Sequence, residues 1–186
     1  MISQAKMNNY NKILIIGCPG TGKSTLARKL GDITKLPVIH LDKFWHDESL
    51  WSGDITQKKK QWRRCVTKLV EDDRWVMDGN YTSTLDIRIP KADLIIFLDY
   101  SVFSALFGVM KRRLQFWGAS NVREDMPIGW EERLNTHLIK KVLEFKRSHK
   151  PRILKYIEDS NSNALIFQRR KELLEYINQF EKMTGS

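Results

Sequence analysis

The sequence predicts an α/β fold with a parallel sheet, and two observations lead to this prediction. Residues 17–24 read G-C-P-G-T-G-K-S, a complete phosphate-binding loop of the form G-x-x-x-x-G-K-[ST]. Along the rest of the chain, short apolar runs alternate with helical patterns, which is typical of parallel strands that are connected through helices. The apolar runs are almost uninterrupted, as expected of strands that are buried on both faces of a sheet.

The elements follow from these patterns in chain order. Five apolar runs are expected to form the strands: Lys12–Ile16, Val38–Leu41, Trp75–Met77, Leu94–Leu98 and Ala164–Phe167. Apolar side chains at helical spacing predict three helices between or after them: about Asp54–Glu71, about Val102–Gln115 and Lys171–Phe180. A fourth helix is expected to carry Leu134, Leu138, Val142 and Phe145, and Pro151 is expected to begin a short fifth one.

The phosphate-binding loop has the flanks that this motif requires. The apolar run 13–16 precedes it and the helical pattern 24–30 follows it, so strand, loop and helix are in the expected order. Glycines let successive backbone N–H groups point at phosphate oxygens, and the helix N-terminus adds its positive end. Lys23 is expected to reach the β- and γ-phosphates of ATP, and the Ser24 hydroxyl to bind Mg²⁺. The predicted nucleotide contacts are Gly17, Cys18, Pro19, Gly20, Thr21, Gly22, Lys23, Ser24 and Thr25.

Three aspartates follow predicted strands. Ligands of open parallel sheets bind beyond the carboxyl ends of the strands, so Asp42, Asp78 and Asp99 are candidates for the site. A carboxylate is needed to hold Mg²⁺ opposite the loop, and both Asp78 and Asp99 could supply it. We favour Asp78, because Gly79 permits close backbone approach and a polar loop follows. Asp99 is the better candidate for a helix N-cap.

Asp42 is the candidate residue on the side of the phosphate acceptor. It could contact the acceptor, help to hold the metal or serve as general base, or it could be a solvated carboxylate at the end of a strand. His40, two residues earlier, is interpreted as a packed strand histidine. Of the tryptophans, Trp45, Trp51 and Trp117 occupy loop-like stretches in which they could stack on a base, although most tryptophans are expected to pack in the core.

A basic segment follows the predicted fourth strand. Residues 111–152 hold eleven Lys/Arg and five Asp/Glu, more than half of the net charge of +10. Phosphoryl transfer needs water exclusion and positive charge on the transferring group, and an arginine-bearing loop that closes over ATP supplies both. Arg112 and Arg123 are the first candidates, with Arg113 and Arg133 behind them. The alternative is a solvated basic face.

Composition limits the class of protein. The 186 residues suffice for one domain with a real core, and neither a secretory signal nor a membrane span is expected, which favours a cytoplasmic protein. The two cysteines, Cys18 and Cys65, form neither a disulfide framework nor a metal motif, and Cys18 is interpreted as a small filler of the loop.

The order of several motifs resembles the bacterial adenylate-kinase-related proteins that are commonly labelled DNA topology modulation proteins. The resemblance runs from about Lys12 to Phe180 and is carried by the phosphate loop and these stretches: His40–Asp42, Trp75–Tyr81, Leu85–Arg88, Ala92–Asp99, Lys111–Arg113 and Arg123–Pro127. It implies a nucleoside-monophosphate-kinase-like, three-layer α/β/α fold with a five-stranded parallel sheet. It further implies one domain, with an acceptor-binding insertion at about 43–73 and a helical lid at about 112–133.

The resemblance also assigns roles to residues. Asp78 matches the aspartate that supports Mg²⁺ in adenylate kinases, and Arg112 matches an arginine at the base of the lid. Gly108 departs from the pattern, because an arginine usually stands there. Acceptor-site arginines have no clear match, and the only nearby residues are Arg63, Arg64 and Arg88. Base recognition would fall around Gln168 and Arg169.

We therefore expect an ATP-dependent, Mg²⁺-dependent phosphotransferase that acts on a small molecule or a nucleotide. Its catalytic residues would be Lys23, Asp42, Asp78, Arg112 and Arg123, with Ser24 and Asp78 at the metal. The basic charge allows a second hypothesis, a nucleic-acid-binding protein with an ATP switch, although no nucleic-acid-binding motif is present. Gly108 allows a third, an ATP-binding protein that has lost catalysis. The acceptor itself carries no motif.

Overall fold

The computed structural model describes residues 10–116, 125–127 and 136–184. These residues contain one five-stranded parallel sheet with the strand order β2-β3-β1-β4-β5. Its strands are β1 (Lys12–Gly17), β2 (Val38–His40), β3 (Trp75–Asp78), β4 (Leu94–Leu98) and β5 (Asn163–Phe167). Each strand end lies within one residue of the sequence prediction, which confirms the predicted fold class and its strands.

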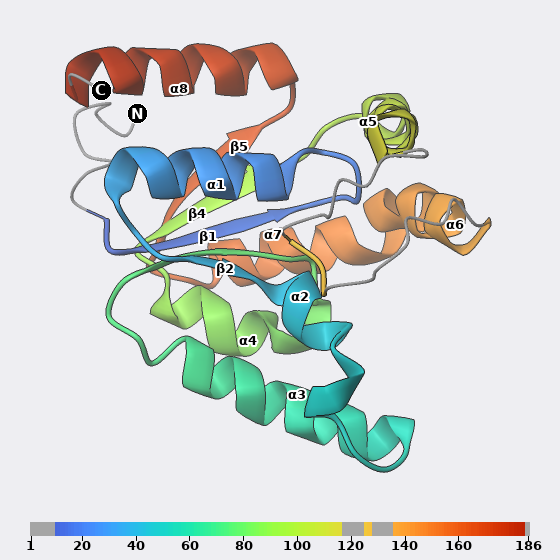
Figure 1. Ribbon diagram of the computed structural model, residues 1–186. Helices are drawn as coiled ribbons and strands as arrows, with labels where there is room; N and C mark the ends of the chain where they lie inside the picture. Colours follow the sequence, from blue (N-terminus) through green and yellow to red (C-terminus); the bar gives the residue numbers. More distant parts are fainter. Residues whose placement is uncertain (1–9, 117–124, 128–135, 185–186) are drawn as a thin grey trace.

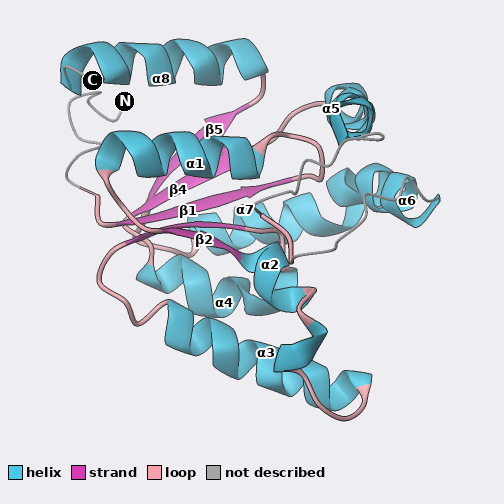
Figure 2. Ribbon diagram, viewed as in Figure 1, coloured by secondary structure: helices cyan, strands magenta, loops and turns pink. Residues whose placement is uncertain are grey.

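Helices cover both faces of the sheet (Figures 1 and 2). On one face lie α1 (Lys23–Thr34) and α8 (Arg170–Thr184), and on the other lie α3 (Ile55–Leu69), α4 (Leu85–Arg88) and α7 (Lys150–Glu158). The helices α5 (Val102–Phe116) and α6 (Thr136–Glu144) lie at the end of the sheet towards which the strands point. The predicted three-layer α/β/α arrangement is therefore present.

The strands separate two hydrophobic cores, because successive side chains of a strand point to opposite faces. Ile13 and Ile15 of β1 pack in the core under α1 and α8. Leu14 and Ile16 pack in the other core, together with Trp62 of α3 and other side chains of the helices on that face. All four β1 side chains are completely buried, so the continuous apolar run of this strand is explained by burial on both faces.

Several helices differ from the sequence prediction. The chain enters helix α2 (Leu41–Trp45) directly after β2, so Leu41 and Trp45 are helical rather than part of a strand and a loop. The predicted short helix is α7, which begins at Lys150, one residue before Pro151, but it is not a separate helix. Instead, α6 continues through a π-helical turn, Phe145–His149, into α7. Leu134 and Trp117 lie outside the described residues.

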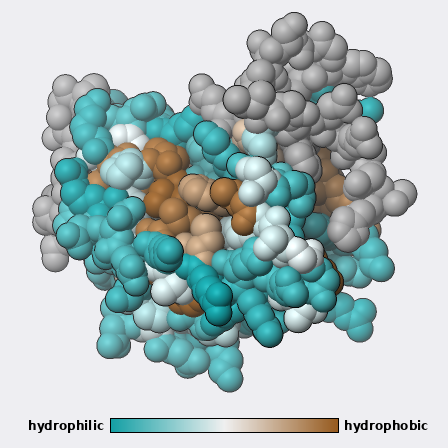
Figure 3. Space-filling model, turned by 60° about the horizontal axis from the view of Figure 1, so that its bottom comes forward, coloured by the Kyte–Doolittle hydropathy of each residue, from teal (hydrophilic) through white to brown (hydrophobic). Residues whose placement is uncertain are grey.

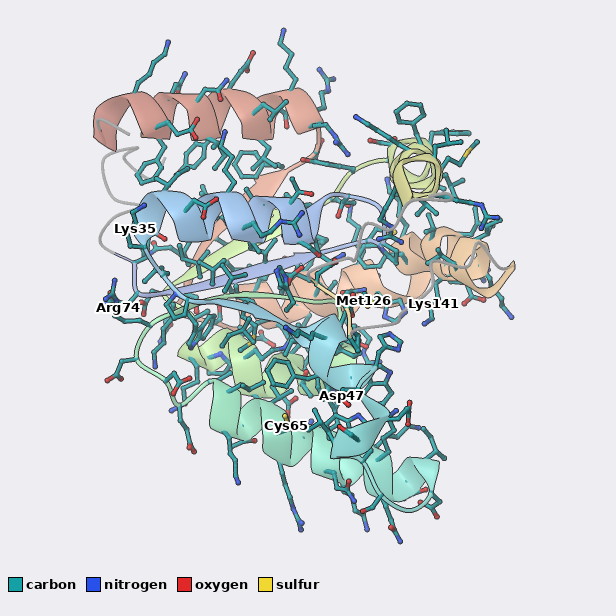
Figure 4. All side chains as sticks on the ribbon, viewed as in Figure 1. Lys35, Asp47, Cys65, Arg74, Met126 and Lys141 are labelled. Atoms are coloured by element: carbon teal, nitrogen blue, oxygen red, sulfur yellow. The ribbon has the colours of Figure 1, made fainter. Side chains whose placement is uncertain are left out.

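The register of the sheet brings the carboxyl ends of three strands around the phosphate-binding loop. Gly17 at the end of β1 pairs with Leu98 of β4, and Asp78 of β3 pairs with Ile15 on one side and with His40 on the other. Figure 4 shows Asp47, Met126 and Lys141 at this end of the molecule, whereas Lys35 and Arg74 mark the opposite end. Any ligand of the loop binds at the end marked by the first three residues.

The surface is mainly polar. The face that carries α3 and α4 comes forward in Figure 3, where hydrophilic side chains surround a hydrophobic patch. Within the described part of the chain, no helix combines the length and the apolar character needed to cross a membrane.

Candidate active site

The phosphate-binding loop connects β1 to α1, and hydrogen bonds between its own residues hold it in shape. Gly20 and Gly22 have positive φ angles of 85° and 90°, which glycine adopts without steric cost. The Cys18 carbonyl accepts a hydrogen bond from the Thr21 hydroxyl at 2.8 Å, which fixes the turn. Helix α1 begins at Lys23 directly after the loop, and its first N–H groups therefore face the space that the loop surrounds. This arrangement suits an anion.

Lys23 reaches back across the loop. Its Nζ donates a hydrogen bond to the Cys18 carbonyl at 3.1 Å. Burial of the ammonium group lowers the pKa of Lys23, while the nearby carboxylates of Asp42 and Asp78 oppose this shift and Arg112 adds to it. The structure thus brings four of the predicted site residues, Lys23, Asp42, Asp78 and Arg112, within electrostatic range of one another. They come from α1, α2, β3 and α5.

Asp78 is the last residue of β3 and is almost completely buried. Its Oδ2 accepts a hydrogen bond from the Ser24 hydroxyl at 2.7 Å, and its Oδ1 lies 2.6 Å from Nδ1 of His40. The two carboxylate oxygens are therefore oriented from opposite sides, one by the loop and one by the neighbouring strand. His40 is a packed strand residue, as expected, and it also orients a predicted metal ligand.

The Ser24–Asp78 pair fits a magnesium ion. A hydroxyl and a carboxylate are hard oxygen ligands, and Mg²⁺ in nucleotide sites takes one or two protein oxygens together with waters and substrate phosphates. The Ser24 oxygen and the Asp78 carboxylate lie at hydrogen-bonding distance beside the loop, so one ion could contact both after displacing the hydrogen bond between them.

Asp42 lies in the first turn of α2, not in a loop after the strand. Its Oδ1 accepts a hydrogen bond from the Tyr81 hydroxyl at 2.6 Å. Burial and the Asp42 carboxylate raise the pKa of Tyr81, so the phenol keeps its proton and acts as donor. Tyr81 follows β3 in the polar loop that the sequence placed at the cleft, and it holds one oxygen of Asp42 in place.

Asp99 has a different role from the one expected. Its Oδ2 forms an ion pair with Lys150 Nζ at 2.6 Å, at the first residue of α7. The N-terminus of α5 is capped by Ser101 instead, because Ser101 Oγ accepts a hydrogen bond from the Ser104 N–H at 3.2 Å. The interpretation of Asp99 as a helix cap is therefore wrong, and the side chain ties the end of β4 to α7.

The predicted lid lies only partly within the described residues. Arg112 and Arg113 lie in the last turns of α5, whereas Arg123 and Arg133 lie outside the described residues. Within the described piece 125–127, both Asp125 and Met126 are buried. Figure 4 places Met126 at the carboxyl end of the sheet, so this part of the predicted lid is buried at the end where the loop lies.

The three candidate acceptor arginines lie in different environments. Arg88 is completely buried and donates to the carbonyls of Gly79 and Tyr81, at 3.0 and 2.8 Å, and to the Thr84 hydroxyl at 3.2 Å. Burial lowers the pKa of Arg88 to about 10. Arg63 forms two hydrogen bonds with Asp86, and Arg64 is exposed on α3. The first two thus support the loop around Tyr81 and the contact between α3 and α4.

Aromatic rings cluster in and beside the predicted acceptor region. Trp45, Trp51, Trp62 and Tyr81 pack on one another with centroid distances from 4.8 to 6.5 Å. Lys58 Nζ lies 4.8 Å from the Trp45 ring and pairs with Glu48 at 2.8 Å. The two predicted base-stacking tryptophans described here, Trp45 and Trp51, therefore contact other tryptophans, in the same cluster that holds Tyr81 against Asp42.

Two further sequence interpretations can be compared with the structure. Cys18 is buried in the loop, and burial raises the pKa of its thiol to about 11, so the reactive thiolate is scarce near neutral pH. Gln168 and Arg169, the candidates for base recognition, donate their backbone N–H groups to Glu172 at 3.1 Å each. The backbone of these two residues therefore forms part of the N-terminal cap of α8, and their role in base recognition stays a prediction.

Sequence reasoning missed the partners that orient the site. His40, Tyr81 and Lys150 contact Asp78, Asp42 and Asp99, respectively, across 38, 39 and 51 residues of chain. Strand order could have suggested His40, because the last residues of adjacent parallel strands are neighbours. No local pattern indicates the other two.

Comparisons with known proteins support the fold. No family model and no curated protein sequence matches this chain. Among solved structures, a shikimate kinase from Acinetobacter baumannii in complex with shikimate is similar, with a TM-score of 0.61 and 9% identity over 98% of this chain and 97% of that one. A shikimate kinase from Bacteroides thetaiotaomicron has a TM-score of 0.54 and 15% identity, covering 95% and 99%. The chain thus has the α/β fold of these kinases and of nucleoside-monophosphate kinases.

Proposed function

We propose that the chain is an ATP-dependent, Mg²⁺-dependent phosphotransferase that acts on a hydroxyl group of a small molecule. The observation that carries this proposal is the group of charges at the carboxyl end of the sheet. Lys23 lies on the phosphate-binding loop, Asp78 is held by Ser24, and Asp42 lies within electrostatic range of Lys23. A phosphate grip, a metal ligand and a base are the parts that phosphoryl transfer to a hydroxyl requires.

Each side chain has a role in this mechanism. The loop N–H groups and Lys23 hold the β- and γ-phosphates, and Arg112 adds positive charge as the phosphoryl group moves. Ser24 and Asp78 would hold Mg²⁺, which neutralises phosphate charge. Asp42 accepts the proton of the attacking hydroxyl through the oxygen that Tyr81 does not occupy. Arg123 is a further candidate for the closing lid and lies outside the described residues.

Two observations support a hydroxyl acceptor over a nucleotide phosphate. Asp42 is near enough to Lys23 to oppose the lowering of the Lys23 pKa by burial, so a carboxylate lies beside the predicted path of transfer. Of the arginines that could bind an acceptor phosphate, Arg88 is used by backbone carbonyls and Arg63 by Asp86. The kinase with bound shikimate shows that a protein of this fold takes a small molecule, which supports the same class of reaction here. The relation to adenylate-kinase-related proteins is part of the proposal.

The direct test is a screen for ATP consumption against nucleosides, sugars and nucleotides, with the Lys23→Ala variant as the negative control. We expect acceptor-dependent consumption that falls by about 100-fold or more in Lys23→Ala. The matched control is Lys29→Ala, which alters a lysine of the same helix that pairs with Glu181 away from the loop. Activity that survives in Lys23→Ala, or a wild-type chain that neither binds ATP nor consumes it, would contradict the proposal.

A further inference from the structure

One face of helix α5 packs directly on the phosphate-binding loop. If Gly20 carried a Cβ atom, that atom would lie 2.2 Å from the Ala105 carbonyl oxygen and 2.8 Å from a methyl group of Val109. Both residues are buried on α5, whereas Phe107 on the same helix is 69% exposed. The helix therefore has an inner face against the loop and an outer face towards solvent.

Gly108 lies directly against the loop backbone. A Cβ atom at this position would lie 1.9 Å from the Gly20 carbonyl oxygen, whereas real Cβ contacts are not shorter than 3.0 Å. Helix and loop would have to separate by at least about 1 Å to admit one methyl group. Gly108 has ordinary helical geometry, because it is absent from the glycines with positive φ. A glycine inside a helix costs about 1 kcal/mol relative to alanine, and the backbone conformation of Gly108 does not require one. The close approach of the loop explains why glycine stands here.

Arg112 follows Gly108 by four residues, so both lie on the same face of α5. The charge of Arg112 acts on Lys23, which places the guanidinium in the electrostatic field of the site. The loop contact at Gly108 therefore determines how far from the loop this arginine lies.

We propose that Gly108 is a positioning residue, whose backbone contact with Gly20 sets the reach of Arg112 towards the γ-phosphate of bound ATP. The inference rests on the proposed function. It also gives a reason for the departure noted in the sequence. An arginine at position 108 would meet the Gly20 carbonyl at once, so the glycine allows a closer helix instead of marking a lost activity.

The test compares the binding of two nucleotides by calorimetry. This measurement does not need the unidentified phosphate acceptor. The probes are Mg²⁺ with ADP and Mg²⁺ with a non-hydrolysable imido analogue of ATP. We expect Gly108→Ala to weaken binding of the ATP analogue by about tenfold more than binding of ADP, since an error of about 1 Å at a reacting group costs up to about 100-fold. In an Arg112→Ala background, the same substitution should change the ratio of the two affinities by less than about twofold, as coupled residues do in a double-mutant cycle.

Controls separate this role from a general loss of structure. Phe107→Ala changes the neighbouring, exposed side chain and should leave both affinities unchanged. Val109→Ala removes methyl groups from the same contact without adding an atom, so it cannot clash, and it should weaken the ATP analogue selectively even if Gly108→Ala does not fold. Equal losses for ADP and the analogue, or the same loss with and without Arg112, would overturn the inference and leave the proposed function intact. A wild-type chain that binds neither nucleotide would overturn both.

Discussion

The chemistry of the site depends on how each carboxylate is held. Both oxygens of Asp78 are held, one by Ser24 and one by His40, which fixes the orientation of the proposed metal ligand. Asp42 has one oxygen held by the Tyr81 hydroxyl, whose raised pKa keeps it a donor. Two neighbouring aspartates can therefore have different roles, one in metal binding and one in proton transfer.

The Asp42→Asn variant tests this division of roles. Asparagine keeps the size of the side chain and an oxygen for Tyr81, but it cannot accept a proton at neutral pH. We expect turnover with a hydroxyl acceptor to fall by about 100-fold to 10,000-fold, while affinity for ATP changes little. Steady-state kinetics and calorimetry measure the two effects. Asp54→Asn is the matched control, because asparagine still caps α3. Unchanged turnover in Asp42→Asn would exclude Asp42 as the general base.

Individual elements are joined at the site by arginines with very different burial. Arg88 at the end of α4 is completely buried and holds the carbonyls of Gly79 and Tyr81, so it shapes the loop between Asp78 and α4. Arg63 on α3 pairs with Asp86 on α4, and its side chain is 46% exposed. Water cannot replace the hydrogen bonds of the buried Arg88, whereas it can replace those between the exposed Arg63 and Asp86.

This difference predicts unequal effects on stability. Arg88→Leu removes the donor of the buried Gly79 carbonyl and one donor each from the Tyr81 carbonyl and the Thr84 hydroxyl, so we expect a loss of about 3 kcal/mol or more in the free energy of unfolding. Arg63→Ala breaks an exposed ion pair and should cost less than about 1 kcal/mol. Urea unfolding of both variants measures the two losses. Similar losses would show that the burial of Arg88 does not control the stability of this loop.

Over the whole molecule, the net charge of +10 sets the long-range electrostatics. A basic surface attracts ATP and any polyanion, nucleic acid included. Residues 111–152 carry most of the excess charge, and the helices α5 and α6 within this range lie at the carboxyl end of the sheet. If the protein is a kinase, this charge attracts the phosphates of ATP. Under the alternative hypothesis, it would attract the phosphates of a nucleic acid.

The salt dependence of DNA binding distinguishes the two. We expect only weak binding, lost between about 50 and 200 mM salt, because non-specific phosphate contacts release counterions. Fluorescence anisotropy with a labelled duplex measures it. The variant with Lys111, Arg112 and Arg113 changed to alanine is compared with one that changes the exposed Lys59 and Lys60 of α3. Tight binding at 200 mM salt that only the first variant abolishes would favour the nucleic-acid hypothesis.

Local patterns were sufficient for most of the fold. The phosphate-binding loop is a contiguous motif, and the strands are contiguous apolar runs, so both could be located within one residue from the sequence. The position of Asp78 beside the loop followed from strand ends, since parallel strands end at one edge. The exact course after β2 could not be predicted, because Leu41–Trp45 is a short helix that begins without a break.

The sequence by itself therefore determined the phosphate-binding loop and the strands, and from them it predicts a phosphorylated nucleotide as ligand. Folding added the contacts that join distant segments: His40 to Asp78, Tyr81 to Asp42 and Gly108 to Gly20. Contacts of this kind depend on how two elements pack, and packing distance is a property of the whole core rather than of either segment. Gly108 shows this most clearly, because the same residue departs from a pattern in the sequence and lets α5 lie directly against Gly20 in the structure.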